Sequence, residues 1–522
     1  MNKAINLITR RNALLNLAAV TPFVASQTAT PVKPKMQDKN TSITTLTAPA
    51  PNGLTTLLFF DDEPLFIRNN ITRRLGTTKR LSAYHEELGN CTWGYPGVFI
   101  CDDGKWRMVY QAGVNHPGVK KKGGGGIFLL AESPDGQNWK PQVTENEIDI
   151  PSRVAPHQIL PDDGSLFSGV FEDPWPATPK ERYKLLSSNE PKGETKLWTS
   201  ADLVHWVRAE AKGWQKEAPD PPSFPFWNAV RSCYLIATRP GPTDRRICFT
   251  ETRDWKSFTP RQLVLQADAE DQPLAQLYGM YVLPYDGYYI GALWLYYAGN
   301  ATPSPSVPSY LYYGGKQETY LSYSINGDHW QRCMHEPLFR NGQPGEPDAG
   351  CLQVSNITRA KDGSLRCYAS CSSLEHGNVP ESDGYIVTYE LRKDGFVCLE
   401  AGPTVGRIST RALYWEGGEA ELNLDAKGGL ARVRVVKANG EELPGFGFGD
   451  CIPLSDADSI AWTPQWKSGN SLQNLAGTMV RIEVEMTSAR IYALRGNFIL
   501  SRWHEVRTLK ETNTPPSKKM GL

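Results

Sequence analysis

Short hydrophobic segments separated by turn residues recur along most of the chain. Turn formers such as the Asp-Asp-Gly sequence at 102–104 stand between them. Apolar segments of this length, bounded by turn residues and rich in aromatic and branched side chains, are typical of β-strands. The pattern therefore predicts an all-β protein. The clearest segments precede Trp139 and Trp330: 96–100, 106–110, 126–131, 279–283, 288–296 and 319–323.

A second pattern repeats where these strands end. Ser133–Trp139, Ser200–Trp206 and Ser324–Trp330 each carry Asp or Asn two residues after the Ser. Thr252–Trp255 is a shortened copy, and Arg392–Phe396 is a degenerate copy with Phe in place of Trp. Ser and Asp side chains cap tight turns through hydrogen bonds to the backbone. Because one such unit cannot bury its own faces, the repeat predicts a five-bladed β-propeller.

The strand pattern changes after residue 402. The segments 420–424, 431–436 and 480–485 alternate apolar and polar residues, which suits a β-sandwich. The length of 522 residues also favours two domains. The predicted organisation is a signal peptide at 1–29, a linker at 30–54, a five-bladed β-propeller at 55–402, a β-sandwich domain at 403–505 and a flexible tail at 506–522.

The first residues have the layout of an export signal. Lys3, Arg10 and Arg11 precede an apolar stretch at 13–25, which is too short for a membrane span. The arginine pair resembles a twin-arginine signal, and an ordinary secretory signal is the alternative. Both predict an exported protein, periplasmic or extracellular. No later segment is apolar enough to predict a membrane span.

Composition narrows the possible partners. The 56 basic and 56 acidic residues balance, so nucleic acid is not an expected partner. The 15 Trp and 22 Tyr suit either an all-β core or the binding of sugar rings. The ten cysteines lack zinc-site spacing. Cys233 and Cys248 could form a disulfide across a hairpin or be buried thiols. The oligomeric state is not indicated.

The segment Ser200–Trp206 (Ser-Ala-Asp-Leu-Val-His-Trp) is similar to the Ser-x-Asp-Leu-x-x-Trp strand of the five-bladed propeller glycosidases, glycoside hydrolase families 32, 43, 62, 68 and 117. A propeller followed by a β-sandwich resembles family 32 in particular. The resemblance covers residues 55–500 and concerns the fold, because family 130 phosphorylases share this architecture. It implies an axial pocket with three acidic groups: a nucleophile or general base, a general acid and an orienting carboxylate.

The catalytic motifs of family 32 are absent from this chain. It lacks Trp-Met-Asn-Asp-Pro-Asn, Arg-Asp-Pro and Glu-Cys, and Tyr95-Pro96 stands where family 43 carries Asp-Pro. Catalytic residues are therefore predicted from their place in a blade. The innermost strand of a blade begins at the pocket rim, and the second strand ends there. Acidic residues at these two places are the candidates.

Asp173 is the first catalytic candidate, since Phe171-Glu-Asp-Pro174 is expected to end the second strand of blade two. An ion pair with Arg182 is its structural alternative. Asp348 and Asp220 are expected to open the inner strands of blades five and three. Each of these positions predicts a carboxylate near the pocket.

Two further acidic pairs are candidates. Glu86 and Glu87 precede the first blade and could reach the rim, or could lie in a solvated loop; Glu87 is taken as the candidate. Asp61 and Asp62 follow the apolar segment 57–60, which is expected to close the ring beside the last blade. Closure would bring Asp62 near the axis.

Five residues are predicted to bind substrate. Trp93, Tyr95, Trp175 and Tyr278 stand at loop positions where they could stack on sugar rings, with core packing as the alternative. His157 begins the inner strand of blade two and could bind a sugar hydroxyl or a carboxylate, or could pack. No cofactor is expected. No metal site is predicted, and the sequence does not decide whether calcium binds.

The leading functional hypothesis is an exported glycoside hydrolase that acts on the ends of plant or algal oligosaccharides or polysaccharides. A pocket on one axis suits chain ends better than chain middles. The first alternative is a non-catalytic glycan-binding propeller, which the missing motifs favour. The second is a glycoside phosphorylase, against which export argues, because phosphorolysis is most useful inside the cell.

Overall fold

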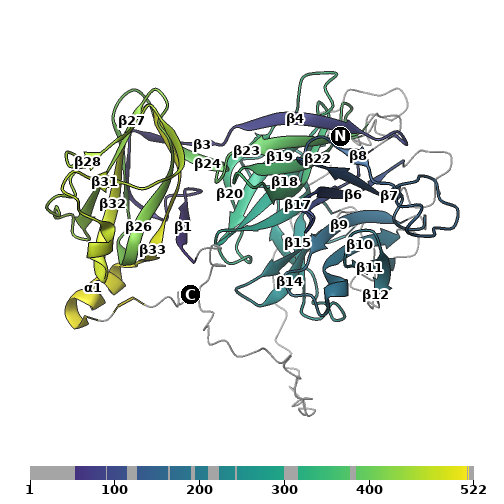
Figure 1. Ribbon diagram of the computed structural model, residues 1–522, viewed down its shortest axis with the longest axis horizontal. Helices are drawn as coiled ribbons and strands as arrows, with labels where there is room; N and C mark the ends of the chain where they lie inside the picture. The colour runs from purple at the N-terminus through teal and green to yellow at the C-terminus, as the bar shows by residue number, and fades with distance from the viewer. Residues whose placement is uncertain are drawn as a thin grey trace, which may run out of the picture. The chain divides into compact units, whose positions relative to one another are not determined.

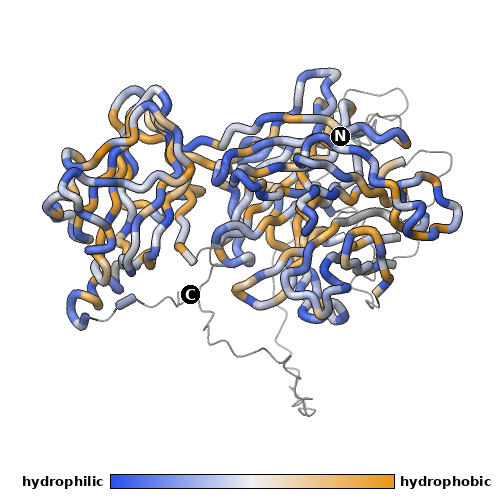
Figure 2. Tube along the Cα trace, viewed as in Figure 1, coloured by the Kyte–Doolittle hydropathy of each residue, from blue (hydrophilic) through white to orange (hydrophobic). Residues whose placement is uncertain are grey.

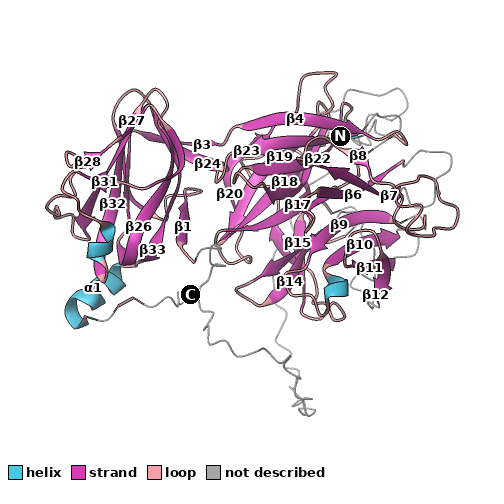
Figure 3. Cartoon of the chain, in the orientation of Figure 1, coloured by secondary structure: helices cyan, strands magenta, loops and turns pink. Residues whose placement is uncertain are grey.

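The computed structural model describes most of the chain after residue 52: residues 53–89, 91–113, 126–162, 165–189, 194–209, 223–241, 244–298, 315–376, 384–513 and 515–516. The predicted signal peptide and nearly all of the predicted linker lie outside these residues. The described chain is almost entirely β-structure, and Figure 3 shows helices only as short pieces. This confirms the all-β prediction.

Three sheets each consist of four strands that are consecutive in the sequence and antiparallel. The first contains β5 (Gly97–Ile100), β6 (Trp106–Ala112), β7 (Ile127–Ser133) and β8 (Lys140–Pro141). The second contains β9 (Leu166–Glu172), β10 (Tyr183–Asn189), β11 (Glu194–Ser200) and β12 (Trp206–Ala209). The third contains β13 (Phe224–Asn228), β14 (Cys233–Thr238), β15 (Ile247–Thr252) and β16 (Gln262–Leu265).

An eight-stranded sheet holds two more groups of four strands, linked by one parallel pairing of Gln317 with Cys351. The first group is β17 (Ala275–Tyr285), β18 (Tyr288–Tyr297), β19 (Gln317–Ser324) and β20 (Gln331–Phe339). The second is β21 (Cys351–Arg359), β22 (Leu365–Ser372), β23 (Tyr385–Leu391) and β4 (Thr78–His85). Strand β4 comes from the beginning of the chain and pairs with β23, so it joins two distant parts of the sequence.

Eleven of the remaining strands form one sheet, in which β26, β32 and β33 are central (Figure 1). Its strands are β1 (Thr55–Leu58), β2 (Leu65–Asn69), β3 (Ile71–Leu75), β24 (Val397–Ala401), β25 (Gly406–Thr410), β26 (Leu413–Asp425), β27 (Leu430–Lys437), β29 (Leu454–Ser455), β30 (Asp458–Trp462), β32 (Thr478–Thr487) and β33 (Ala489–Leu500). Strands β28 (Cys451–Ile452) and β31 (Gln465–Trp466) form a separate pair.

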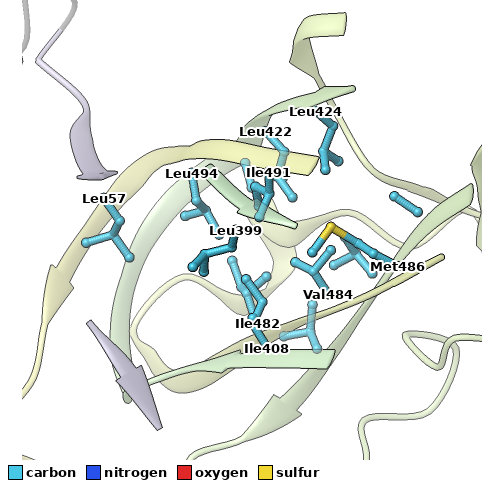
Figure 4. Close-up of a cluster of buried hydrophobic side chains, with 14 of the residues drawn as sticks. Leu57, Leu399, Ile408, Leu422, Leu424, Ile482, Val484, Met486, Ile491 and Leu494 are labelled. Atoms are coloured by element: carbon cyan, nitrogen blue, oxygen red, sulfur yellow. The ribbon is translucent and has the colours of Figure 1, made fainter. Parts of the chain in front are cut away.

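Alternation of buried and exposed positions explains this sheet. Strands β26 and β27 alternate buried with partly exposed residues over much of their length, as a half-buried strand requires. Figure 2 shows hydrophobic and hydrophilic residues mixed along these strands. The buried residues form one core, in which the labelled side chains gather (Figure 4): Leu57, Leu399, Ile408, Leu422, Leu424, Ile482, Val484, Met486, Ile491 and Leu494.

Two predictions about the ends of the propeller segment are wrong. The range 55–402 includes β1, β2, β3 and β24, which all pair within the eleven-stranded sheet. The segment 57–60 does not close a ring, because β1 pairs with β33. Strand β4 instead completes the last four-stranded group, since its pairing edge meets β23 in register. The alternation of a single strand does not reveal which distant edge it will pair with.

The C-terminal tail also differs from its prediction. Residues Trp503–Thr512, predicted largely as a flexible tail, form helix α1. Glu505 accepts a hydrogen bond from the Arg502 backbone N–H, and Arg507 pairs with Glu511 one turn later, which stabilises a short helix. Among the described residues, short 3₁₀ helices also lie at Pro179–Glu181 and Leu472–Leu475. Within the described residues, no helix has the length and apolar character needed to cross a membrane.

The predicted turn repeat is confirmed by its hydrogen bonds. In each of four copies the first hydroxyl accepts from the backbone N–H three residues later, and the following Asp or Asn accepts from two further N–H groups. These side chains hold the backbone in a tight turn, as expected. The paired residues are Ser133 with Asp135, Ser200 with Asp202, Thr252 with Asp254, and Ser324 with Asn326.

The third copy of the repeat has full length, contrary to the prediction. Trp255 occupies the turn position that has positive φ in every copy (φ 58°), where Leu203 stands in the second copy (φ 71°). The aromatic residue six positions after Thr252 is Phe258, which bridges back to Thr252 as Trp206 pairs with Ser200. The prediction was wrong because it identified the end of this copy by a Trp, at Trp255. The six-residue spacing that the other copies share identifies Phe258.

The cysteine alternatives are resolved by strand register. Thr238 pairs with Cys248, and Tyr234, next to Cys233, pairs with Thr252. Cys233 and Cys248 thus lie several residues apart along the hairpin. All ten cysteines, each within the described residues, are free. Cys233 and Cys248 are therefore buried thiols, which is the second of the two alternatives.

Candidate functional site

The first strands of the five four-stranded groups contact one another in closed order: β5 with β9, β9 with β13, β13 with β17, β17 with β21, and β21 with β5. They therefore surround a common axis. Residues from the ends of all five strands line one cavity of about 510 Å³. The five strands thus end on one side, which we call the finish side. The opposite side, where they begin and where the antiparallel second strands end, is the start side.

Aromatic side chains gather on the start side. Trp93, just before β5, stacks on Tyr278 of β17 with ring centroids 6.0 Å apart and an interplanar angle of 16°. His376, which follows β22, lies 5.3 Å from both rings and within hydrogen-bond distance (3.1 Å) of the Tyr278 hydroxyl. Tyr278 is buried, whereas Trp93 and His376 are half-buried. The start side therefore presents a Trp and a His over a buried Tyr.

Two arginines lie beside this stack. The guanidinium carbon of Arg239 is 4.3 Å from the Tyr278 ring centroid, and that of Arg245 is 5.3 Å from it. Arg239 is fully buried and donates two hydrogen bonds to the Tyr278 carbonyl, at 2.8 and 2.6 Å. Arg245 also lies over Tyr296 of β18, at 4.9 Å. We call Trp93, Tyr278, Tyr296, His376, Arg239 and Arg245 the start-side cluster.

Glu375 is an acidic residue that directly precedes His376 of this cluster. Burial raises the pKa of Tyr296 to about 12; the Arg245 charge opposes this rise and the Glu375 charge adds to it. Glu375 is half-buried and follows the second strand of its group. The sequence analysis did not predict Glu375 or His376. Glu375 nevertheless meets the rule stated there, because it is an acidic residue that follows the second strand of its group. Arg239 and Arg245 were missed because only acids and aromatics were sought.

Glu86, the neighbour of the predicted Glu87, also lies on the start side but is buried. Its carboxylate accepts hydrogen bonds from Tyr84 (2.8 Å) and Tyr110 (2.5 Å) and lies 3.3 Å from His157 Nε2. Burial alone would raise the pKa of Glu86, but the hydrogen bonds from His157 and Tyr110 outweigh it and lower the pKa to about 2. Glu86 is therefore ionised, and the predicted His157 contacts a carboxylate. Glu87 itself is exposed.

Asp173 lies on the finish side, after β9, which is the first strand of its group and not the second. Its carboxylate accepts hydrogen bonds from Lys184 (2.6 Å) and from the Tyr234 hydroxyl (2.7 Å). The predicted partner Arg182 pairs instead with Glu172 and Asp102. The catalytic role of Asp173 stays a prediction, but the expectation about its strand is wrong.

The other predicted acids are separated from one another. Asp348 is buried and accepts hydrogen bonds from Arg80 (2.7 Å) and Tyr389. Asp62 pairs with Arg68 of β2 and Arg73 of β3, two strands of the eleven-stranded sheet. Asp220 lies outside the described residues. No hydrogen bond or ion-pair network joins any two of the four predicted acids that the structure describes, since each has its own partners or is exposed.

The predicted aromatic residues fall into different environments. Trp93 and Tyr278 come together in the start-side cluster. Tyr95 is buried against Trp294, with ring centroids 5.4 Å apart, so it belongs to the core. Trp175 is 65% exposed on the finish side.

One group of side chains has metal-ligand character. Asp268, Asp271 and His335 have ligand atoms within 4.8 Å of one another. Arg332 already pairs with both aspartates at 2.7 Å. The positive charge of Arg332 offsets the charge that would attract a cation.

No family model matches the chain. No curated protein matches it either. The chain is similar to several solved structures. An N-acetylgalactosamine deacetylase from F. plautii shares 14% identity with it, over 63% of this chain and 97% of that one, with a TM-score of 0.39.

Two other solved structures align with more of the chain. An exo-β-1,3-galactanase from Phanerochaete chrysosporium shares 9% identity, over 81% of this chain and 99% of that one, with a TM-score of 0.37. A β-fructofuranosidase from Schwanniomyces occidentalis shares 10% identity, over 81% and 98% of the two chains, with a TM-score of 0.38. These values are too low to assign an activity or a substrate to this chain.

Proposed function

We propose that this protein is a glycoside hydrolase that acts on the ends of plant or algal oligosaccharides or polysaccharides. The observation that carries this proposal is the start-side cluster, where Trp93 and His376 lie over buried Tyr278 beside two arginines and Glu375. Partly exposed aromatic rings bind the apolar faces of sugars, and arginine and histidine bind hydroxyl or carboxylate groups.

The proposed architecture is a five-bladed β-propeller followed by a β-sandwich. The closed order of contacts among β5, β9, β13, β17 and β21 supports five blades. Strand β4, from the beginning of the chain, would complete the last blade. A propeller places the substrate on the axis, and a site on one axis favours chain ends.

Glu375 is the carboxylate that we propose to take part in glycosidic bond cleavage, because it directly precedes His376 of the start-side cluster and its charge adds to the raised pKa of Tyr296. Asp220 remains a proposed second carboxylate, since cleavage needs a pair of them. We assign Glu86 a positioning role, since its side chain is 1% exposed and is held by three neighbouring side chains.

The test is turnover of a panel of aryl-glycosides and plant and algal oligosaccharides. Glu375→Gln should lower turnover roughly a hundredfold to ten-thousandfold, as expected for loss of a general acid or base. Glu145→Gln, an exposed glutamate after β8, is the matched control and should keep wild-type turnover. Asp220→Asn and Glu87→Gln test two of the other predicted acids. Full activity in Glu375→Gln would remove Glu375 from the mechanism.

Two alternatives have their own outcomes in this assay. Binding of oligosaccharides without turnover by the wild type would identify a non-catalytic glycan-binding propeller. The second alternative is a glycoside phosphorylase. The arginines of the start-side cluster are compatible with it, because guanidinium groups bind phosphate. Turnover that requires inorganic phosphate and releases a sugar phosphate would identify that activity.

Export is also part of the proposal, on the basis of the first 29 residues. Fractionation of producing cells should place the protein outside the cytoplasm. A double substitution of Arg10 and Arg11 by lysine should retain it inside if a twin-arginine pathway exports it. Unchanged export would indicate an ordinary secretory signal.

A further inference from the structure

Trp175 is an exposed tryptophan on a braced loop of the finish side. Its side chain is among the most exposed large apolar groups of the described chain, at 65%. Its ring packs edge-on against Trp227, with centroids 6.2 Å apart, and Trp227 packs on Tyr234 at 4.9 Å. A ligand that covered this ring would remove a large apolar surface from water, which is favourable.

Asp173 fixes the backbone that carries this tryptophan. One carboxylate oxygen accepts hydrogen bonds from the Trp175 backbone N–H at 2.8 Å and from the Tyr234 hydroxyl at 2.7 Å. The other accepts from Lys184 at 2.6 Å. The same Tyr234 hydroxyl lies 3.3 Å from the Trp175 carbonyl. Trp175 is thus presented in a preorganised position, which reduces the entropy lost when a ligand binds.

A pocket of about 410 Å³ opens beside Trp175, a size that suits small-molecule sites. Trp255 and Tyr234 line it together with Trp175. A second hollow of about 890 Å³ shares Asp173 and Ala177 with the first. The two hollows flank the loop, so a ligand longer than one sugar unit could cross Trp175.

The charges around the pocket are uneven. Three acids line it: Asp173 pairs with Lys184, Glu181 lies 4.0 Å from the same lysine, and Asp254 caps the turn at Lys256 and Ser257. Arg253 pairs with Glu251. Arg208 and Lys256 are exposed and form no ion pair with any residue in the described part of the chain. Two exposed cations without an ion-pair partner, beside the exposed ring of Trp175, complement an anionic sugar chain.

We infer that the finish side carries a second carbohydrate-binding site, on Trp175, Arg208 and Lys256, for polysaccharides that bear carboxylate or sulfate groups. The site would hold a polymer while the start side acts on chain ends. This inference rests on one part of the proposed function, that the protein binds carbohydrate. It does not require that the protein hydrolyses it.

Isothermal titration of the full chain with three soluble polymers tests this site: a galacturonate polymer, a sulfated galactan and a neutral galactan. The wild type should bind one or both anionic polymers more tightly than the neutral one, and added salt should weaken this binding. The two anionic polymers distinguish carboxylate from sulfate. Trp175→Ala should weaken binding about tenfold, as expected for the loss of one stacking contact.

Phe66→Ala is the matched control, because Phe66 is an exposed aromatic residue (57%) on β2 of the eleven-stranded sheet. It should bind as the wild type does. A double variant, Arg208→Gln with Lys256→Gln, should lose the preference for anionic polymers while Trp175 still supports weak binding.

Equal binding by Trp175→Ala and wild type, or tighter binding of the neutral polymer, would overturn the inference. A loss of binding in Phe66→Ala equal to that in Trp175→Ala would also overturn it. Turnover of a short oligosaccharide, measured on the same proteins, separates the two proposals. Trp175→Ala should keep that turnover, and absence of turnover in the wild type would contradict the hydrolase while leaving the binding test intact.

Discussion

Glu86 on the start side and Asp173 on the finish side are both carboxylates with 1% exposed side chains, yet their partners differ. Asp173 is neutralised by Lys184 and receives a tyrosine hydrogen bond from the neighbouring sheet. Glu86 receives hydrogen bonds from two tyrosines and contacts His157, and no lysine or arginine among the described residues pairs with it.

The difference shows that burial of an acid does not by itself define a catalytic group. A buried ion pair such as Asp173–Lys184 fixes the geometry of a loop, here the one that carries Trp175. A buried carboxylate that is held by hydroxyl groups stays ionised only because each hydrogen-bond donor stabilises its negative charge. The start side is therefore expected to be sensitive to pH and to loss of a single hydroxyl, and the finish side to loss of its cation.

The largest effect is expected from Lys184→Met. This change leaves Asp173 buried without a cation, so the free energy of unfolding should fall by about 3–5 kcal/mol in urea denaturation followed by tryptophan fluorescence. The double variant Lys184→Met with Asp173→Leu should recover only part of that loss, because the apolar pair needs no counter-charge but leaves the Trp175 N–H and the Tyr234 hydroxyl without their acceptor. A single variant as stable as the wild type would contradict the assignment of a structural ion pair.

Acid should destabilise the start side through Glu86. Its pKa is lowered from 4.5 to about 2 in the folded chain, so its contribution is complete above pH 4.5 and is lost as the pH falls toward 2. The shift corresponds to about 3 kcal/mol. Unfolding measured across this range should show a steeper loss of stability for the wild type than for Glu86→Gln. Parallel curves for the two proteins would disprove the role of Glu86.

Removal of one hydroxyl from each carboxylate compares the two sides directly. Tyr110→Phe should lower the free energy of unfolding by about 2 kcal/mol, because it removes a hydrogen bond to an ionised Glu86 that has no lysine or arginine partner among the described residues. Tyr234→Phe should cost about 1 kcal/mol, because Asp173 keeps Lys184. Thermal unfolding of the two variants measures the difference, and the opposite order would contradict the comparison.

The smallest effect is expected away from both carboxylates, in the turn repeat. Ser200→Ala removes the hydroxyl that accepts from the Leu203 backbone N–H and should cost about 1 kcal/mol or less. Ser324→Ala, in an equivalent turn with glycine at the same position, should cost a similar amount. Thermal unfolding checks both. A loss as large as that of Lys184→Met would show that the turns do more than end strands.

Much of the strand content could be predicted from local pattern, because a strand and its turn are determined within about a dozen residues. The strands at 420–424, 431–436 and 480–485 lie within β26, β27 and β32. Strand partners could not be predicted, since β1 pairs with β33 and β4 with β23 across hundreds of residues.

The candidate site was harder to predict than the fold. Trp93 and Tyr278 were predicted separately and are joined by contact between two different sheets. Glu375 and His376 sit three and four residues beyond the end of β22, in a segment without a repeat motif. No sequence pattern indicated Arg239, because its guanidinium group contacts the backbone carbonyl of Tyr278, which lies 39 residues away in the chain.

The sequence by itself determined the all-β class, the turn repeat and the position of many strands, since alternation and side-chain capping act between neighbours in the chain. Only the tertiary structure decided which acids are paired and which aromatics are exposed. Glu86 meets His157 across 71 residues, and Asp173 meets Tyr234 across 61. Such contacts follow from how sheets pack against each other, and no local pattern records them.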